Sequence, residues 1–319
     1  MKDAHRTSSS IIKIGSLDQE TELILKNYGF VSIESNAFDL FVKLKTLNLS
    51  ENKIQVVNRS LENLLDLEVL DMSNNFLESI PLEANKSKQY KRLQSLNLSE
   101  NKISNLDSSM LRCLPSLTKL NLACNSLGQI KDMVFSLLVN LKELDLSENY
   151  IEILKAKSLG GLSNLESLNL GNNSIEFIEA DTFKHLSKLK TLDLSSNDIK
   201  TMQINQFTGL VSLEHLNLQS NLIVEISDHF ALLSALQSLN LSTNNIQRIT
   251  CNSFDKLSHL RRLDMSNNAI KSVEKNSFRH LISLKILDLS FNEIDIIDNS
   301  LFQNLPSLTN VYIENDKLT

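Results

Sequence analysis

Leucine and asparagine recur along this chain in the frame LxxLxLxxNxL. The first leucine of the frame returns mostly every 24 residues, at Leu44, Leu67, Leu93, Leu117, Leu141, Leu165, Leu189, Leu213, Leu236, Leu260, Leu284 and Leu308. The asparagine returns with it until the last unit, where Asp316 stands, at Asn52, Asn75, Asn101, Asn125, Asn149, Asn173, Asn197, Asn221, Asn244, Asn268 and Asn292. Such agreement at a fixed period indicates a repeat architecture, in which each unit packs against its neighbours.

The LxLxx part of each unit predicts a short β-strand, because its leucines point to one face and its polar residues to the other. Successive strands are then parallel neighbours in one sheet. The recurring asparagine lies where the chain turns away from the strand. There its side-chain amide can bond buried backbone groups that would otherwise be unsatisfied, so we interpret the asparagine ladder as structural.

A large apolar residue stands six positions before each first leucine. Phenylalanine occupies this position in eight units, at Phe38, Phe135, Phe183, Phe207, Phe230, Phe254, Phe278 and Phe302. One ring in each unit favours a stacked core spine over a ligand-binding box. We therefore expect none of these rings to belong to a functional site.

The repeats predict an α/β fold, a right-handed horseshoe-shaped solenoid with a parallel β-sheet on its concave face. Irregular or short helical segments on the convex face need more room than a strand spacing of about 4.8 Å, so the stack must curve. We expect residues 1–19 to form a tail or partial cap and residues 20–319 to form the repeat domain. Residues 20–43 are a degenerate first unit with Tyr28 at the asparagine position, and twelve repeats follow from residue 44.

The segments LNLSENKI, LDLSENYI, LNLGNNSI and LDLSSNDI resemble the motif of the leucine-rich-repeat superfamily, and the resemblance covers residues 44–318. The 24-residue unit with a central F..L, as in NSFDKLSHLRRLDMSNNAI, is similar to the subtype of Toll-type receptor ectodomains, chaoptin-like adhesion proteins and small leucine-rich proteoglycans. This resemblance implies a receptor or adhesion module that recognises proteins outside the cell on its concave face. The cysteine-rich caps of those families have no counterpart before Leu44 or after Leu318.

Composition gives no support for catalysis. The chain has only 7 glycines, and neither GxxxxGK nor GxGxxG occurs in it. The three cysteines and six histidines show no metal-ligand or nucleophile spacing, so we expect no catalytic residue, no metal and no cofactor. A net charge of -6 argues against nucleic acid as a partner. We also expect no membrane insertion, since no apolar stretch reaches the length of a membrane helix and no export signal is seen.

The location of the protein follows from the resemblance and not from a targeting signal. Among the N-x-S/T triplets, Asn58 and Asn85 are the convincing surface acceptors for glycosylation, whereas Asn48, Asn97 and Asn240 would project from the concave strands. An extracellular or receptor-type module that binds a protein ligand is the leading hypothesis. The alternatives are an intracellular scaffold or regulatory subunit, and the recognition arm of a larger enzyme.

The outward residues of the strands form the expected contact surface. In its middle part charges alternate from repeat to repeat, as in Lys142, Glu166, Lys190 and Glu214, and neighbours should neutralise each other. Toward the C-terminal end cationic and apolar residues replace this pattern. Since Arg and aromatic residues are enriched in interface hot spots, the predicted partner-binding residues are His215, Arg261, Arg262, Lys285, Ile286, Phe291 and Tyr312. A second cationic group on the return leg of repeat 3 (Lys86, Lys88, Lys91 and Arg92) is expected to be a solvated bulge, with a basic docking patch as the alternative.

Overall fold

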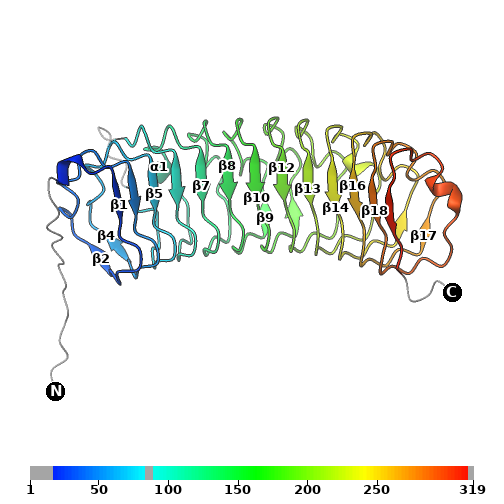
Figure 1. Ribbon diagram of the computed structural model, residues 1–319, viewed down its shortest axis with the longest axis horizontal. Helices are drawn as coiled ribbons and strands as arrows, with labels where there is room; N and C mark the ends of the chain where they lie inside the picture. Colours follow the sequence, from blue (N-terminus) through cyan, green and yellow to red (C-terminus); the bar gives the residue numbers. More distant parts are fainter. Residues whose placement is uncertain (1–16, 83–88, 315–319) are drawn as a thin grey trace, which may run out of the picture.

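Three-residue strands, one from each unit, form a single large parallel sheet. The computed structural model describes residues 17–82 and 89–314. The sheet has 13 strands that follow the order of the chain. They are β1 (Glu22–Ile24), β3 (Thr46–Asn48), β5 (Val69–Asp71), β6 (Ser95–Asn97), β7 (Lys119–Asn121), β8 (Glu143–Asp145), β10 (Ser167–Asn169), β12 (Thr191–Asp193), β13 (His215–Asn217), β14 (Ser238–Asn240), β16 (Arg262–Asp264), β18 (Ile286–Asp288) and β19 (Asn310–Tyr312). The predicted solenoid is confirmed, and its strands lie side by side along the molecule (Figure 1).

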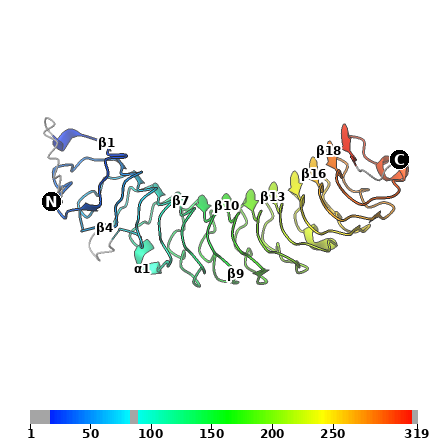
Figure 2. The same ribbon diagram turned by 90° about the horizontal axis from the view of Figure 1, so that it is seen from below.

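The sheet lines the inner side of the arc, as Figure 2 shows, while the return segments spread over the outer side. The register is the same at every pair, with leucine opposite leucine, as in Leu144, Leu168 and Leu192, except between β18 and β19, where Leu287 lies opposite Val311. These central leucines are buried, and the first and third residues of each strand face the concave side. Each unit therefore presents a fixed pair of strand side chains to a partner.

The return side contains little helix. The structure shows one four-residue helix, α1 (Ser108–Leu111), and the short 3-10 helices η1 (Leu17–Gln19), η2 (Asp228–Phe230) and η3 (Asn299–Phe302). Pairs of two-residue strands were not expected from the sequence. They are β2 (Ser32–Ile33) with β4 (Val56–Val57), β9 (Ile153–Leu154) with β11 (Phe177–Ile178), and β15 (Arg248–Ile249) with β17 (Ser272–Val273). No helix in the described ranges is long and apolar enough to cross a membrane.

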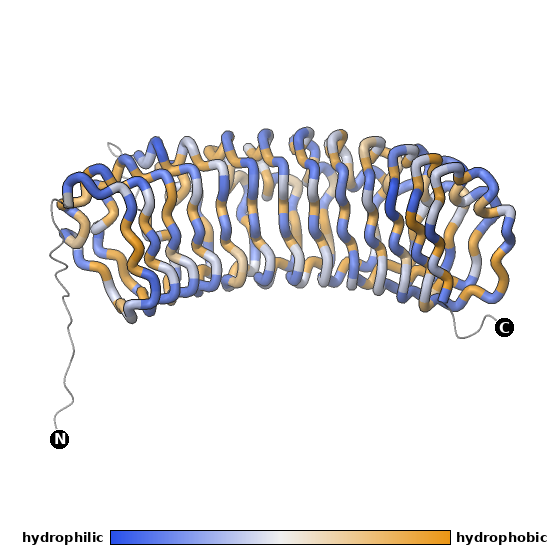
Figure 3. Tube along the Cα trace, in the orientation of Figure 1, coloured by the Kyte–Doolittle hydropathy of each residue, from blue (hydrophilic) through white to orange (hydrophobic). Residues whose placement is uncertain are grey.

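The interior is a continuous column of leucine, isoleucine and phenylalanine. Hydrophobic segments recur at similar heights in successive coils (Figure 3). The expected phenylalanine stacking is confirmed in the C-terminal half, where the ring centroids of Phe183 and Phe207 are 6.2 Å apart and those of Phe207 and Phe230 are 5.9 Å apart. Phe302 is only partly buried, because the last described coil has a neighbour on one side only.

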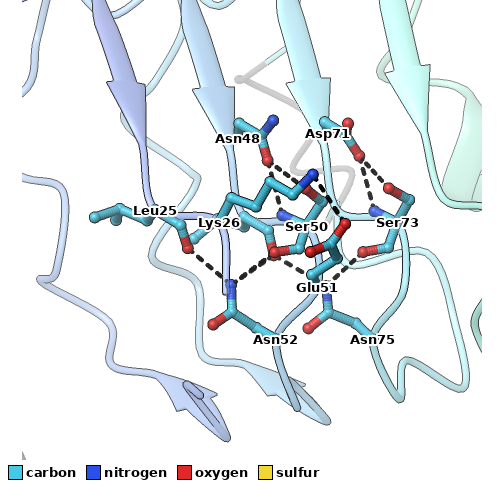
Figure 4. A network of polar contacts seen from close by, with 10 residues as sticks. Leu25, Lys26, Asn48, Ser50, Glu51, Asn52, Asp71, Ser73 and Asn75 are labelled. Carbon is cyan, nitrogen blue, oxygen red and sulfur yellow. Dashed lines mark hydrogen bonds and ion pairs between the residues drawn. The ribbon is translucent and has the colours of Figure 1, made fainter. Parts of the chain in front are cut away.

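The asparagine ladder makes the bonds expected of it. The Asn52 amide nitrogen donates to the carbonyl oxygens of Leu25 (2.8 Å) and Leu49 (2.9 Å), one from each of two successive coils (Figure 4). Its side-chain oxygen accepts from the backbone N–H groups of Tyr28 (2.9 Å) and Phe30 (3.1 Å). This arrangement continues to Asn292. Since a buried unsatisfied polar group costs about 1–3 kcal/mol, the ladder stabilises each junction between coils.

Candidate partner-binding site

The residues that directly precede the strands of the large sheet form a row on the concave side, here named the leading column. Backbone hydrogen bonds join its members from coil to coil, as between the N–H of Glu166 and the carbonyl of Lys142 (2.8 Å) and between the N–H of Lys285 and the carbonyl of Arg261 (2.9 Å). Side chains in this column thus stand one strand spacing apart, about 4.8 Å. From β8 to β18 the column reads Lys142, Glu166, Lys190, Glu214, Gln237, Arg261 and Lys285.

In the middle of the sheet the leading column neutralises itself. Glu166 pairs with Lys190 at 3.0 Å and with Lys142 at 3.8 Å, which confirms the pairing expected from the alternating charges. A hydrogen bond from Lys190, followed by the attraction of its charge, lowers the pKa of Glu166 from its usual value. Farther along, the Gln237 amide donates to Glu214 at 3.0 Å. In this part of the concave face, exposed polar side chains therefore pair with one another.

Where the third residue of a strand is Asp or Asn, its side chain also forms hydrogen bonds with nearby residues. The Asp193 side chain accepts from the backbone N–H (2.8 Å) and the hydroxyl (2.6 Å) of Ser195, and its other oxygen accepts from Asn217 at 3.1 Å. The same Asp–Ser pattern recurs at Asp145 and Asp264. These Asp and Asn side chains hold the turn after each strand, so they are less free to serve a partner.

At β16 and β18 the leading column changes character. Arg261 and Lys285 are exposed neighbours, and neither has an ion pair within the part of the chain that the structure describes. Arg262, the first residue of β16, reaches only Asp264 of its own strand, at 3.7 Å. Three cations therefore gather on two neighbouring coils, and only Arg262 has an ion pair among the described residues.

The apolar residues predicted for the site differ in exposure. Phe291 and Tyr312 are exposed, with 55% and 48% of their surface accessible. Ile286, which the sequence suggested to be exposed, is half-buried. Its strand lies between β16 and β19, in register with Arg262 and Asn310. Among the predicted contact residues, the exposed apolar side chains are thus the aromatic ones.

Phe291 is held in a strained backbone conformation. It occupies the residue before the ladder asparagine, where the chain takes a left-handed turn in unit after unit, and its φ is +56°. Elsewhere this position carries Asn in three units and Glu, Ser, Thr or Cys in the others, so Phe291 is the bulkiest side chain in this left-handed turn. A large ring that is both strained and exposed is unfavourable for the free protein, and such strain is often kept at binding sites.

The structure brings together six of the seven predicted contact residues, which we name the C-terminal patch: Arg261, Arg262, Lys285, Ile286, Phe291 and Tyr312. His215 is exposed but lies two strands away, since it pairs with Ser238 and Ser238 pairs with Arg262. Sequence reasoning missed Asn310, which is exposed beside Ile286 on β19. Only the strand register places it there, because the last unit departs from the repeat consensus.

Comparison with known proteins agrees with this geometry. The family model described as leucine rich repeat matches residues 21–77, 67–123, 115–175, 163–223, 212–270 and 258–318. The chain belongs to the leucine-rich-repeat family. No curated protein sequence matches it, so its relatives come from solved structures.

Three solved leucine-rich-repeat structures resemble this chain over most of its length. One is in the TLR13–ssRNA13 complex (26% identity, TM-score 0.71, 88% of this chain and 45% of that one). Another is in an octameric complex of latrophilin 3, Unc5D and the leucine-rich repeats of FLRT2 (26%, 0.72, 85% and 84%). An internalin from Listeria monocytogenes (24%, 0.75, 95% and 83%) matches in fold. The chain thus spans less than half of the TLR13 chain, and no enzymatic family is indicated by these matches.

The remaining candidate chemistry is metal binding and the reactivity of the cysteine thiols. Among the described residues no group of three or more His, Cys, Asp and Glu side chains could hold a metal ion. All three cysteines are free thiols. Burial raises the pKa of Cys113 to about 11, and burial together with the carboxylate of Glu148 raises the pKa of Cys124 to about 11. Neither thiol is a ready nucleophile, because the thiolate is the reactive form.

The other surface predictions have different outcomes. Asn58 is exposed, although Ser60 of its N-x-S triplet is buried, whereas Asn85, Lys86 and Lys88 lie outside the described residues. The Asn48 side chain is half-buried on the concave sheet and accepts from the Ser50 hydroxyl of its own N-x-S triplet at 2.7 Å. In the return-leg cationic group, Arg92 forms an ion pair with Asp66 at 3.1 Å.

Proposed function

We propose that this chain is a non-enzymatic recognition module that binds a protein ligand through the C-terminal patch of its concave face. The observation that carries the proposal is the contrast between this patch and the rest of the sheet. In the middle the outward charges satisfy one another. At β16–β19, two exposed aromatic rings are presented together with Arg261 and Lys285, which have no ion pair among the described residues. Arg, Tyr and other aromatic anchors dominate binding energy at protein interfaces.

The rigidity of the sheet supports this use. Every strand is hydrogen-bonded on both sides except the outermost two, so the backbone of β16 and β18 loses little conformational freedom when a partner binds, while Tyr312 lies on the outermost strand β19. The FLRT2 relative is found in a complex with other proteins, which favours a protein partner here as well. The TLR13 relative is found with single-stranded RNA, but a net charge of -6 on this chain favours protein over nucleic acid.

We place the module outside the cell or at the cell surface, as a receptor-type or adhesion domain that contributes to signalling. The 24-residue repeat subtype and the exposed acceptor Asn58 support this location. The competing location is intracellular, in a scaffold, a regulatory subunit or the recognition arm of an enzyme. Its support is the set of three free thiols, since secreted proteins usually pair their cysteines.

Affinity capture with matched variants tests the binding proposal. The wild-type chain, the double variant Arg262→Ala/Phe291→Ala and the control Lys142→Ala/Lys190→Ala are each used as bait with lysate and conditioned medium. A specific partner should be captured by the wild type and the control and lost by the patch variant, with each patch substitution weakening binding by more than about 1 kcal/mol. Equal loss with the control would assign binding to the whole concave face.

Intact-mass analysis of the same material tests the location. A glycan that Asn58→Gln removes, together with capture of cell-surface or matrix proteins, would support the extracellular assignment. An unmodified mass with cytosolic partners would replace it with the intracellular scaffold.

A further inference from the structure

Arg261 and Lys285 are two like charges that stand side by side on neighbouring coils. The backbone hydrogen bond from the N–H of Lys285 to the carbonyl of Arg261 (2.9 Å) fixes their separation at one strand spacing. Like charges in this relationship destabilise a sheet. Elsewhere in the leading column a cation has a carboxylate beside it, as Lys45 has Glu68 at 3.0 Å and Lys190 has Glu166 at 3.0 Å.

The nearby carboxylates do not relieve this repulsion. Asp264 is the nearest acidic group to Arg262, at 3.7 Å, but one of its oxygens accepts from the hydroxyl (2.8 Å) and the backbone N–H (3.1 Å) of Ser266. Asp288 likewise accepts from the backbone N–H of Ser290 at 3.0 Å. Both carboxylates are committed to the turns that follow their strands. An anion supplied from outside would therefore meet Arg261 and Lys285 without an internal competitor.

The aromatic part of the patch lies at the opposite end of the same strands. Arg261 and Lys285 precede β16 and β18, whereas Phe291 follows β18 and Tyr312 ends β19. The backbone carbonyl of Tyr312 accepts from the N–H of Leu289 at 2.8 Å, which ties the two aromatic residues to adjacent coils. The patch is consequently cationic at one edge of the sheet and aromatic at the other, with Asp264 and Asp288 between.

We propose that the C-terminal patch binds an acidic peptide segment of its protein partner, a conclusion that rests on the proposed function. One carboxylate of the segment sits between Arg261 and Lys285, where the guanidinium can bond it with two N–H groups and the ammonium adds a second charge. An apolar side chain of the same segment packs against Phe291 and Tyr312. The carboxylate replaces the missing counter-ion, and the apolar contact removes the two exposed rings from water.

Charge complementarity favours this occupant over a nucleic acid. A continuous phosphate backbone that crossed from the cationic edge to the aromatic edge would pass the carboxylates of Asp264 and Asp288, which repel it. A peptide can place its acidic residue at one edge and a neutral residue beside these carboxylates.

The test is selection of a random peptide display library on the purified full chain, followed by affinity measurements with the synthetic selected peptides. We expect enrichment of Asp or Glu within a few residues of an aromatic or aliphatic residue. The variant Arg261→Gln/Lys285→Gln should weaken binding at least tenfold, while the matched control Lys142→Gln/Lys190→Gln in the same column should change it less than twofold. Rising salt concentration should also weaken the binding, since these charges are exposed.

Each other outcome has a defined meaning. Selected peptides without excess acid that still lose affinity on Phe291→Ala would overturn the acidic segment but leave the proposed function intact. Peptides that bind equally to both double variants and to Phe291→Ala, or no enrichment at all, would overturn both. Single-stranded RNA homopolymers are the third probe. RNA binding that Arg261→Gln/Lys285→Gln abolishes, without any peptide enrichment, would assign the patch to nucleic acid instead.

Discussion

The side-chain oxygen of Asn244 accepts a hydrogen bond of 3.0 Å from the backbone N–H of Ile223 in the preceding coil. Its amide nitrogen donates to the carbonyl of Leu218 in that coil (2.9 Å) and to the carbonyl of Leu241 in its own (3.1 Å). One buried side chain therefore satisfies backbone groups of two coils. The ladder therefore joins neighbouring repeats through polar bonds, in addition to the burial of the leucines.

Replacement of this side chain has a matched control in the next residue. Asn244→Ala leaves the N–H of Ile223 and the carbonyl of Leu218 without their partner, and we expect a loss of about 1 to 3 kcal/mol in the free energy of unfolding. Asn245 is exposed, so Asn245→Ala should change stability by less than about 0.5 kcal/mol. Urea unfolding followed by circular dichroism measures both. Equal midpoints for the two variants would contradict the structural role of the ladder.

The buried imidazole of His229 predicts a loss of stability in mild acid. Its Nδ1 accepts from the backbone N–H of Ser227 at 3.0 Å, which requires the neutral ring, and burial lowers the pKa of His229 below 6.5. As the pH falls through 6.5 the unfolded chain binds a proton and the folded chain does not. The stabilisation is therefore complete above this pH and is lost progressively below it, toward the lowered pKa of the folded state.

Unfolding midpoints at about pH 7.5 and about pH 5.5 measure this effect. The wild type should lose more stability over this interval than His229→Gln does. His185→Gln removes an exposed histidine and should keep the response of the wild type. If His229→Gln loses as much stability as the wild type, the acid sensitivity has another source.

Two lysines of the leading column should respond to neutralisation in opposite ways. Lys190→Gln removes the ion pair with Glu166 and should lower the melting temperature slightly. Lys285→Gln removes the repulsion with Arg261 and should raise it slightly. In about 1 M salt both differences should shrink, because screening shortens the range of these charges to about 3 Å. A lower melting temperature for Lys285→Gln would mean that its charge is already compensated within the folded chain.

Phe291 should show a conflict between stability and binding. Phe291→Asn relieves a bulky residue from the left-handed region and should stabilise the fold by about 1 kcal/mol. Phe291→Ala removes the same ring, but alanine has a Cβ and no polar side chain to favour the left-handed conformation. The Ala variant should therefore be stabilised less than the Asn variant. Both variants should weaken binding of the selected peptides. Thermal melts measure the effect of each variant on stability, and titrations with the selected peptides measure its effect on binding. A lower melting temperature for Phe291→Asn would show that the ring contributes to the core.

Much of the fold could be predicted from the sequence because a solenoid makes its contacts between adjacent repeats. The period with which the first leucines recur, from Leu44 and Leu67 onward, predicts which residues lie opposite one another. The register of the central leucines confirms this prediction. The same reasoning placed the asparagine side chains beside buried backbone groups and the phenylalanine rings in a stack. Each of these features depends on residue type and spacing along the chain.

The features on which the patch depends came from the tertiary structure. The absence of an ion pair at Arg261 and Lys285 within the described residues, the partial burial of Ile286 and the left-handed backbone of Phe291 depend on how side chains from three adjacent coils share space. The burial of His229 and the short strand pairs of the return side depend on distances between coils in the same way. The repeat period determines which residues are neighbours. Ion pairing, side-chain exposure and backbone strain depend instead on the side chains that those neighbours carry, so the period alone does not predict them.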